Sequence, residues 1–163
     1  YLSDFYTDMK RWSFNLQIFF LHKRFEMHQK MSASLTSVIQ DRTIYEDLEI
    51  FAKNLYRIGK LSKRDWDNYC GLFKVMNFYL KRPDLIIYLK ADTDTLLRRI
   101  KKRGRDYESL IDPEYIHTLN ISYDRWIESI SDQSVVIIET DYFNIYEDAE
   151  AFNNIQKDIL KRL

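Results

Sequence analysis

Glycine, proline and cysteine are scarce in this sequence: its 163 residues include three glycines, two prolines and one cysteine. So little glycine and proline leaves no room for a flexible linker, and the length is that of one domain. The single cysteine excludes an internal disulfide. Because Cys70 lies in an aromatic-rich helical pattern, we predict a buried thiol in a protein of a reducing compartment.

Long apolar runs and an excess of charge are also absent. No stretch approaches the roughly 18 apolar residues that span a membrane, and no signal peptide is recognisable, so we predict a cytosolic protein without a membrane partner. Lysine plus arginine number 25, as do aspartate plus glutamate, which argues against a nucleic-acid partner. His22, His28 and His117 lack metal-ligand spacing. Any basic function must therefore be local.

Short runs of β-branched and apolar residues predict three buried strands, at Leu35–Gln40, Leu85–Lys90 and Val135–Glu139. Apolar residues spaced by three and four predict helices before, between and after these strands. These helices contain residues 9–19, 48–58, 66–76, 116–130 and 149–159. Strands that alternate with helices predict an α/β domain with a parallel sheet, which binds ligands beyond the carboxyl ends of its strands.

Local signals mark the ends of the predicted helices. Ser62–Asp65 has the form of a capping box, and Asp112-Pro113-Glu114 opens a further helix. Asp92 is a candidate cap for the helix after the second strand, and Gly59 is a helix stop. The aromatic helix around Trp66–Phe78 offers either core or a dimer surface, and we favour core.

The residues that follow the first predicted strand are Asp41, Arg42 and Thr43. A carboxylate is a hard ligand that suits Mg²⁺, and a guanidinium binds phosphoryl oxygens with two hydrogen bonds. This pair predicts a site for a metal ion and an anionic oxygen. The alternative is a solvated turn with a local ion pair.

A strongly basic segment, RRIKKRGR (Arg98–Arg105), follows the second predicted strand. Arg99 and Arg103 are four residues apart and share a helical face, and Gly104 then places Arg105 on a loop. These cations could simply complement the helix dipole on a solvated face. Alternatively they form the mobile charge with which phosphoryl-transfer enzymes close over the transferred group.

Gln17 and Arg24 are seven residues apart, which is close to two helical turns, so both project from nearly the same face. An amide both donates and accepts hydrogen bonds and therefore suits the edge of a nucleobase. The alternative is a pair of exposed polar side chains.

Together these segments resemble the deoxynucleoside kinase family, which includes deoxycytidine, deoxyguanosine and bacterial deoxyadenosine kinases. The resemblance lies in four segments, in family order over nearly the whole chain. They are Tyr6 with RWSFNLQ (Arg11–Gln17), DRTIYEDLEIFA (Asp41–Ala52), PDLIIYLKA (Pro83–Ala91) and RRIKKRGRDYE (Arg98–Glu108).

The resemblance implies a three-layer, P-loop kinase-like α/β fold, in which residues 1–163 form one domain with a parallel sheet flanked by helices. It also implies ATP-dependent phosphorylation of the 5′-hydroxyl of a deoxynucleoside in nucleotide salvage, with ATP and Mg²⁺, by a homodimer. By family analogy, Arg24 and Asp47 form an ion pair that helps to read the base and favours deoxyadenosine, deoxyguanosine or deoxycytidine over thymidine. Gln17 pairs with the base edge, and Phe51 stacks on the base.

The remaining site residues also take their roles from family position. Tyr6 and Glu108 hold the 3′-hydroxyl of the deoxyribose. Arg42 lies near the 5′-hydroxyl and the transferred phosphate, and Asp41, where many relatives have glutamate, helps to hold Mg²⁺. The ATP phosphates are bound by three arginines of a basic lid at about residues 98–110, Arg99, Arg103 and Arg105.

The sequence departs from the family at its start. The family begins with a strand, a GxxxxGK[ST] phosphate loop and a helix, followed by a strand that ends in a Glu-Pro-Val element with the catalytic glutamate. Neither element occurs here, and no glycine precedes Gly59. We expect that these residues were removed or left out, which makes this the carboxyl-terminal part, or that another segment or chain replaces them. Without them the chain is predicted to be inactive alone, and strands that flank the missing one lack backbone partners.

Two alternatives remain open. Thymidylate-type monophosphate kinases also have an Asp-Arg pair after a strand and an arginine lid, but they need extra cations for the phosphate of the acceptor. A non-catalytic subunit that binds nucleotides or nucleic acid could use RRIKKRGR against phosphates. The zero net charge of the chain weighs against a nucleic-acid partner.

Overall fold

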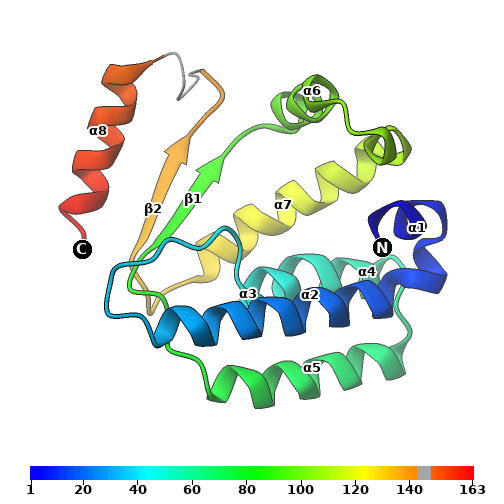
Figure 1. Cartoon of the computed structure of the whole chain (residues 1–163). Helices are drawn as coiled ribbons and strands as arrows, with labels where there is room; N and C mark the ends of the chain where they lie inside the picture. The colour runs from blue at the N-terminus through cyan, green and yellow to red at the C-terminus, as the bar shows by residue number, and fades with distance from the viewer. Residues whose placement is uncertain (143–147) are drawn as a thin grey trace.

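A computed structural model describes residues 1–142 and 148–163 and has an α/β architecture (Figure 1). Its elements along the chain are α1 (Leu2–Thr7), α2 (Met9–Ser32), α3 (Ile44–Glu46), the π-helical turn η1 (Asp47–Ala52), α4 (Lys53–Arg57), α5 (Lys63–Phe78), β1 (Ile86–Lys90), α6 (Thr93–Arg103), the 3₁₀ turn η2 (Asp106–Leu110), α7 (Pro113–Ser129), β2 (Val135–Glu139) and α8 (Ala149–Leu160).

The helices begin and end at the residues whose side chains suit those positions. The side chains of Ser62, Asp92 and Asp112 each accept a hydrogen bond from a backbone N–H of the first turn, which caps α5, α6 and α7. Gly104 ends α6 with φ +66°, a left-handed conformation that glycine adopts without steric cost. The three predicted caps are confirmed, as is Gly104 as the residue that leads from the helix into the loop with Arg105. The predicted stop at Gly59 is also confirmed, because α4 ends at Arg57 and Gly59 follows with φ +71°.

The two strands pair in parallel, with Ile86 opposite Val135 and Lys90 opposite Glu139. This confirms the predicted parallel sheet, and α7 and α8 lie on opposite sides of it (Figure 1). The two faces of the strands are not equally buried: Val136 and Ile138 are buried, whereas Ile137 and Leu89 expose 53% and 62% of their surface. The strands therefore have apolar faces that the described residues leave partly uncovered.

The prediction of a strand at Leu35–Gln40 is wrong. Residues 35–40 form no paired strand, and Leu35 and Ile39 are almost fully exposed. A β-branched, apolar sequence becomes a strand only where a neighbouring strand satisfies its backbone N–H and C=O groups. No described residue pairs with this segment.

The core lies mainly among the helices. One cluster of buried residues joins α1, α2, η1, α4 and α7, and a second joins α2, α3, η1 and α5. In α5, Trp66, Tyr69 and Phe73 pack against the second cluster, as predicted. The opposite side of the same helix is exposed, however, and Cys70 is partly exposed rather than buried.

The apolar stripe predicted for the last helix is not buried. Phe152 is 44% exposed and α8 contains no buried residue. Within residues 1–142 and 148–163, no helix combines the length and the apolar character that a membrane span requires.

Candidate nucleoside and phosphate site

The loop before α3 holds the predicted phosphate-binding arginine in an unusual conformation. Arg42 has φ +62°, a left-handed value that costs a side chain with a Cβ free energy and is more frequent at functional sites. The next residue fixes the turn, because the Thr43 hydroxyl accepts from the Tyr45 N–H and the Glu46 carboxylate accepts from the Thr43 N–H at 2.8 Å. The Arg42 guanidinium carbon then lies 4.9 Å from the centre of the Phe51 ring, within reach of a cation–π interaction.

Arg24 and Asp47 form the predicted ion pair. One guanidinium nitrogen of Arg24 donates to both carboxylate oxygens, at 2.7 and 2.9 Å, and the two side chains are 15% and 2% exposed. Burial raises the pKa of the Asp47 carboxyl to about 6, and the neighbouring Arg24 charge opposes that rise. The pair therefore holds two opposite, largely desolvated charges in contact between α2 and η1.

Gln17 is 2% exposed on the same helix, and its Oε1 atom is buried without a hydrogen-bond partner among the described residues. The alternative of an exposed polar side chain is therefore wrong. Phe51 lies in η1 and meets Tyr123 of α7 edge to face, with ring centres 6.3 Å apart. A free amide oxygen and an aromatic ring are the groups that a planar, hydrogen-bonding base requires.

Tyr6 and Glu108, the two residues predicted to hold a sugar hydroxyl, come together where η2 contacts α1. The Glu108 side chain is 6% exposed and accepts from Arg103, with Nε to Oε2 at 3.2 Å. Burial, followed by the nearby Glu108 charge, raises the pKa of the Tyr6 hydroxyl, which keeps its proton at neutral pH. Tyr6 can therefore both donate and accept a hydrogen bond.

The three lid arginines do not share the same partners in the structure. Arg103 pairs with Glu108, and the nearest guanidinium nitrogen of Arg105 lies 3.8 Å from the same carboxylate. Arg99 instead donates to the hydroxyl of Thr140 at 2.9 Å and to its carbonyl oxygen. Although Arg99 and Arg103 are four residues apart in one helix, Arg99 contacts the residue after β2 and Arg103 contacts η2.

Asp41 is exposed and lies next to Arg42 in the loop. Among residues 1–142 and 148–163, no group of three or more acidic, histidine or cysteine side chains could hold a metal ion. A single carboxylate still fits Mg²⁺, which proteins commonly bind through one or two carboxylates, water and substrate phosphates.

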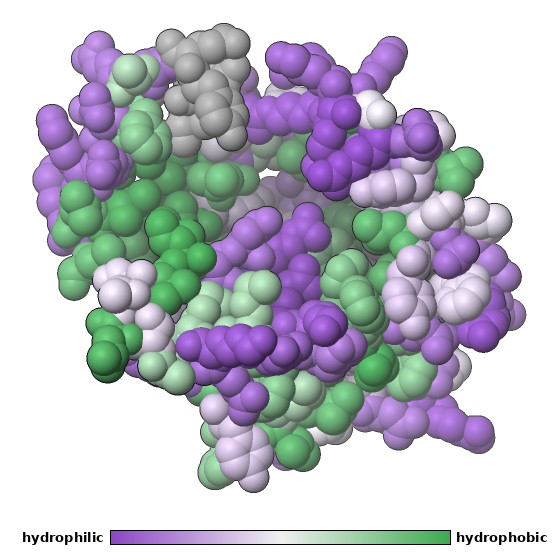
Figure 2. Space-filling model, viewed as in Figure 1, coloured by the Kyte–Doolittle hydropathy of each residue, from purple (hydrophilic) through white to green (hydrophobic). Residues whose placement is uncertain are grey.

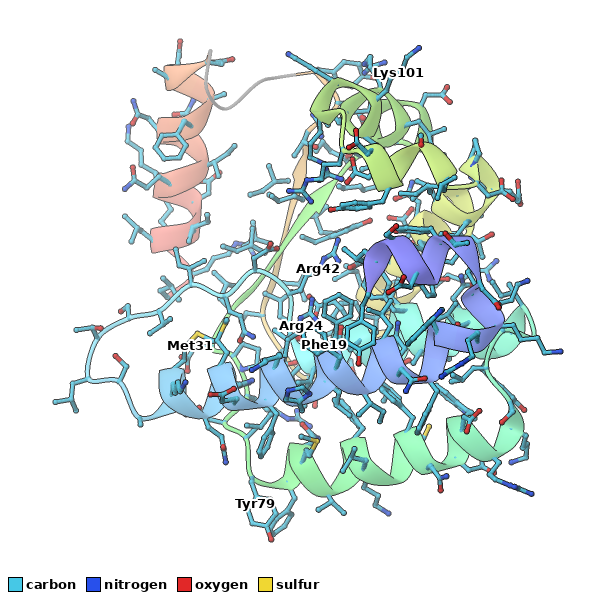
Figure 3. All side chains as sticks on the ribbon, turned by 45° about the vertical axis from the view of Figure 1, so that its right-hand side comes forward. Phe19, Arg24, Met31, Arg42, Tyr79 and Lys101 are labelled. Atoms are coloured by element: carbon cyan, nitrogen blue, oxygen red, sulfur yellow. The ribbon has the colours of Figure 1, made fainter. Side chains whose placement is uncertain are left out.

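Arg42 connects the base side of this site to the sugar side. Its charge affects the pKa of Tyr6 on α1, of Asp47 in η1 and of Tyr123 on α7, so all three groups lie near Arg42. Figure 3 shows Arg24 and Arg42 in this central space, with Lys101 far above it on α6. Figure 2 shows the same face hollowed at its centre, below the hydrophilic side chains over α6.

Sequence reasoning missed three aromatic residues of the site: Tyr107, Tyr123 and Tyr88. Tyr123 lies between Phe51 and Tyr88, which stacks on it with ring centres 6.0 Å apart. The apolar spacing over residues 116–130 predicts a helix at Tyr123 but gives no signal that this ring also faces the site. Tyr107 lies within the RDYE motif, between two acidic residues, but motif position alone does not reveal its ring contact.

A parallel α/β fold with a buried guanidinium–carboxylate pair, a basic segment after a strand and an amide that lacks a partner among the described residues agrees with the nucleoside-kinase resemblance of the sequence. The family model described as "Deoxynucleoside kinase" matches residues 1–163. The chain therefore belongs to the deoxynucleoside kinase family, and the resemblance found in the sequence is confirmed.

Named relatives agree with this assignment. The chain is 37% identical over 161 residues to "Deoxyadenosine/deoxycytidine kinase" of Bacillus subtilis, an alignment that covers 98% of this chain and 74% of that protein. It is 43% identical over 131 residues to "Deoxyadenosine kinase" of Dictyostelium discoideum, with 80% of this chain and 53% of that protein covered. The chain thus spans about half to three quarters of these two relatives.

A solved structure shares the fold. The structure of deoxyadenosine kinase from M. mycoides with bound dATP matches with a TM-score of 0.82 and 30% identity, over 98% of this chain and 80% of that chain. The α/β kinase fold with its parallel sheet is therefore established for this chain.

Proposed function

We propose that this chain contains the acceptor-binding part of an ATP-dependent deoxynucleoside kinase of nucleotide salvage, which phosphorylates the 5′-hydroxyl of deoxyadenosine, deoxyguanosine or deoxycytidine. The observation that carries the proposal is the buried Arg24–Asp47 pair, whose Arg24 lies on α2 together with Gln17, an amide whose oxygen has no hydrogen-bond partner among the described residues. A buried, unpaired amide is costly unless a ligand pairs with it. A nucleobase edge supplies the missing hydrogen bond.

The base and sugar residues divide the acceptor between them. Gln17 pairs with the base edge, Arg24 and Asp47 read it, and Phe51 stacks on it. Tyr6 and Glu108 bind the 3′-hydroxyl. Support comes from the burial of Gln17, Asp47 and Glu108, each below one tenth exposed, because a buried polar group discriminates strongly against a ligand that leaves it unpaired.

The phosphate side of the proposal uses cations that the structure places at the edge of the site. Arg42 would contact the transferred phosphate, Asp41 would be one ligand of Mg²⁺, and Arg103 and Arg105 would bind the ATP phosphates. Arg99 belongs to this group only if its hydrogen bonds to Thr140 are released. Bound Mg²⁺ would neutralise phosphate charge, while these side chains position the phosphates and stabilise the charge that develops.

Thermal-shift titration of the complete gene product tests the proposal. Deoxynucleosides should raise the midpoint of unfolding as their concentration rises, since a ligand of the folded state stabilises it. If deoxynucleoside monophosphates stabilise the protein and deoxynucleosides do not, it is a monophosphate kinase. Stabilisation by short oligonucleotides alone would indicate a nucleic-acid-binding subunit. Either outcome contradicts the proposal.

We further infer a homodimer that forms through α5. Leu72, Val75, Phe78 and Tyr79 lie on its outer side and are 40%, 61%, 83% and 68% exposed, and Figure 3 shows Tyr79 at the outside of this helix. An exposed apolar stripe of this kind suits an isologous contact between two copies. A cytosolic location is also part of the proposal, since the free Cys70 fits a reducing compartment.

Light scattering after size-exclusion chromatography tests the dimer. Wild-type protein should have the mass of two chains, and Val75→Glu should have the mass of one, because a charge is introduced within the apolar stripe. Leu160→Glu is the matched control, since Leu160 is 63% exposed but lies on α8. A monomeric wild type, or a dimer that Val75→Glu leaves intact, would contradict this interface.

A further inference from the structure

Tyr107 makes an aromatic contact that no role assigned above explains. Its ring lies nearly parallel to that of Tyr6, with an interplanar angle of 9° and ring centres 6.4 Å apart. This is within the range of offset stacking, in which two rings attract each other beyond the area they bury. The stack joins α1 to the segment after α6, and these are among the elements that contact each other in the fold (Figure 1).

The hydroxyl end of Tyr107 is held as well. Arg105 donates a hydrogen bond from a guanidinium nitrogen to the Tyr107 hydroxyl at 3.2 Å. The same guanidinium lies 3.8 Å from the Glu108 carboxylate. Tyr107 is therefore fixed at its ring by Tyr6 and at its hydroxyl by the basic segment, next to the acidic residue that also faces Tyr6.

These contacts connect the sugar side of the site to the basic segment. The Tyr6 hydroxyl is close to the charges of Glu108, Arg42 and Arg103, so the orientation of its ring decides whether the hydroxyl and the Glu108 carboxylate can share one ligand. Tyr6 is only partly buried, and Tyr107 covers one face of its ring. Movement of the segment after α6 would remove that cover and the carboxylate together.

We propose that Tyr107 is a positioning residue for Tyr6: its stack holds the Tyr6 hydroxyl beside Glu108, so that the 3′-hydroxyl subsite is complete only when the segment after α6 is packed on α1. The inference rests on the proposed function, in which Tyr6 and Glu108 bind that hydroxyl. In this proposal Tyr107 contacts Tyr6 and Arg105 and does not itself bind the substrate. It makes sugar recognition depend on the position of the basic segment.

The test measures dissociation constants of the complete gene product for a 2′-deoxynucleoside, for the matching 2′,3′-dideoxynucleoside and for ATP. Tyr107→Ala should weaken deoxynucleoside binding about three- to tenfold, the range expected for loss of an aromatic pair. Binding of the dideoxynucleoside and of ATP should change less than twofold. Tyr107→Phe retains the stack and should restore most of the affinity, and Tyr142→Ala, at a residue that is 97% exposed, is the matched control.

A second variant separates positioning from general destabilisation. Tyr6→Phe retains the ring but lacks the hydroxyl, so adding Tyr107→Ala to it should cause no further loss of deoxynucleoside affinity. Tyr107→Leu, which retains apolar volume without an aromatic face, replaces Tyr107→Ala if that variant unfolds at a lower temperature than wild type. It should show the same selective loss.

The possible failures are distinguishable. An equal loss for the deoxynucleoside and the dideoxynucleoside, or affinity within twofold of wild type for Tyr107→Ala and Tyr107→Leu, overturns the inference and leaves the proposed function intact. Wild-type protein that binds no deoxynucleoside contradicts the proposed function, and the sugar role of Tyr107 with it.

Discussion

The helical region and the strand region of this molecule differ in how completely they bury their apolar residues. Among the helices α1, α2, η1 and α4, Leu16, Ile50 and Leu55 are at most 2% exposed. Around the two strands, Leu89 and Ile137 are more than half exposed and α8 contains no buried residue. Figure 2 shows apolar side chains gathered on the surface over the strand region.

The difference in burial also separates the two sides of the proposed site. The residues proposed to read the base, Gln17, Arg24 and Asp47, belong to the well-packed helices, where close packing restricts the rotamers of buried side chains. The cations proposed for the phosphates are exposed, and they lie on α6, in the loop after it and, for Arg42, in the loop before α3. In the proposed function, the acceptor is therefore read by side chains of the core, whereas the phosphates are bound by exposed side chains.

The largest expected effect is on the buried ion pair. Asp47→Ala leaves the Arg24 guanidinium, which is 15% exposed, without its partner, and it should lower the free energy of unfolding by about 3 to 5 kcal/mol. Chemical denaturation measures this. Asp132→Ala removes an exposed ion pair with Arg82 near the strands and should leave stability close to wild type. Similar losses in the two variants would contradict the contrast between the regions.

A leucine pair compares packing in the two regions directly. Leu16→Ala should lower the free energy of unfolding by about 2 to 5 kcal/mol, because it leaves a cavity at a residue that is 2% exposed. Leu89→Ala, at a residue that is 62% exposed in β1, should change it by about 0.5 kcal/mol or less. The same denaturation measurement applies to both. A larger loss at Leu89 would mean that the strand region is covered in solution.

Ligand affinity compares the buried, base-binding side of the proposed site with its exposed, phosphate-binding side. Gln17→Ala should weaken deoxynucleoside binding about tenfold, the scale of one lost hydrogen bond in a buried site, and should affect ATP less. Arg103→Ala, on a side chain that is 50% exposed, should weaken ATP binding more than deoxynucleoside binding. Isothermal titration with each ligand checks this. Equal effects on both ligands in either variant would count against the assigned roles.

The last expected effect is on the pH dependence of stability. The pKa of Asp47 is about 6 in the folded protein, above its ordinary value of 3.8, so the folded state holds this proton more tightly than the unfolded chain. The contribution of Asp47 to the free energy of unfolding should therefore fall as the pH rises from 3.8 to about 6, and stay constant above. Asp47→Asn should remove this slope. An unchanged profile in that variant would show that Asp47 does not titrate in this range.

Many local features were predictable because their causes lie within a few residues. The caps at Ser62, Asp92 and Asp112 and the stop at Gly104 depend on hydrogen bonds and backbone angles of the immediate neighbours. The pairing of Arg24 with Asp47 came from family resemblance, since no local rule connects two residues that far apart. The stack of Tyr107 on Tyr6 had no signal in the sequence at all.

By itself the sequence determined where α5, α6 and α7 begin and where α6 ends, which residues form the two paired strands, and to which family the chain belongs. Tertiary structure decided that residues 35–40 are not a strand, that Arg99 and Arg103 of one helix serve different partners, and that Tyr107 covers Tyr6. The physical reason is the range of the interactions. Caps and helical turns are satisfied locally, whereas a strand, an ion pair or an aromatic stack needs a partner that only the folded chain brings near.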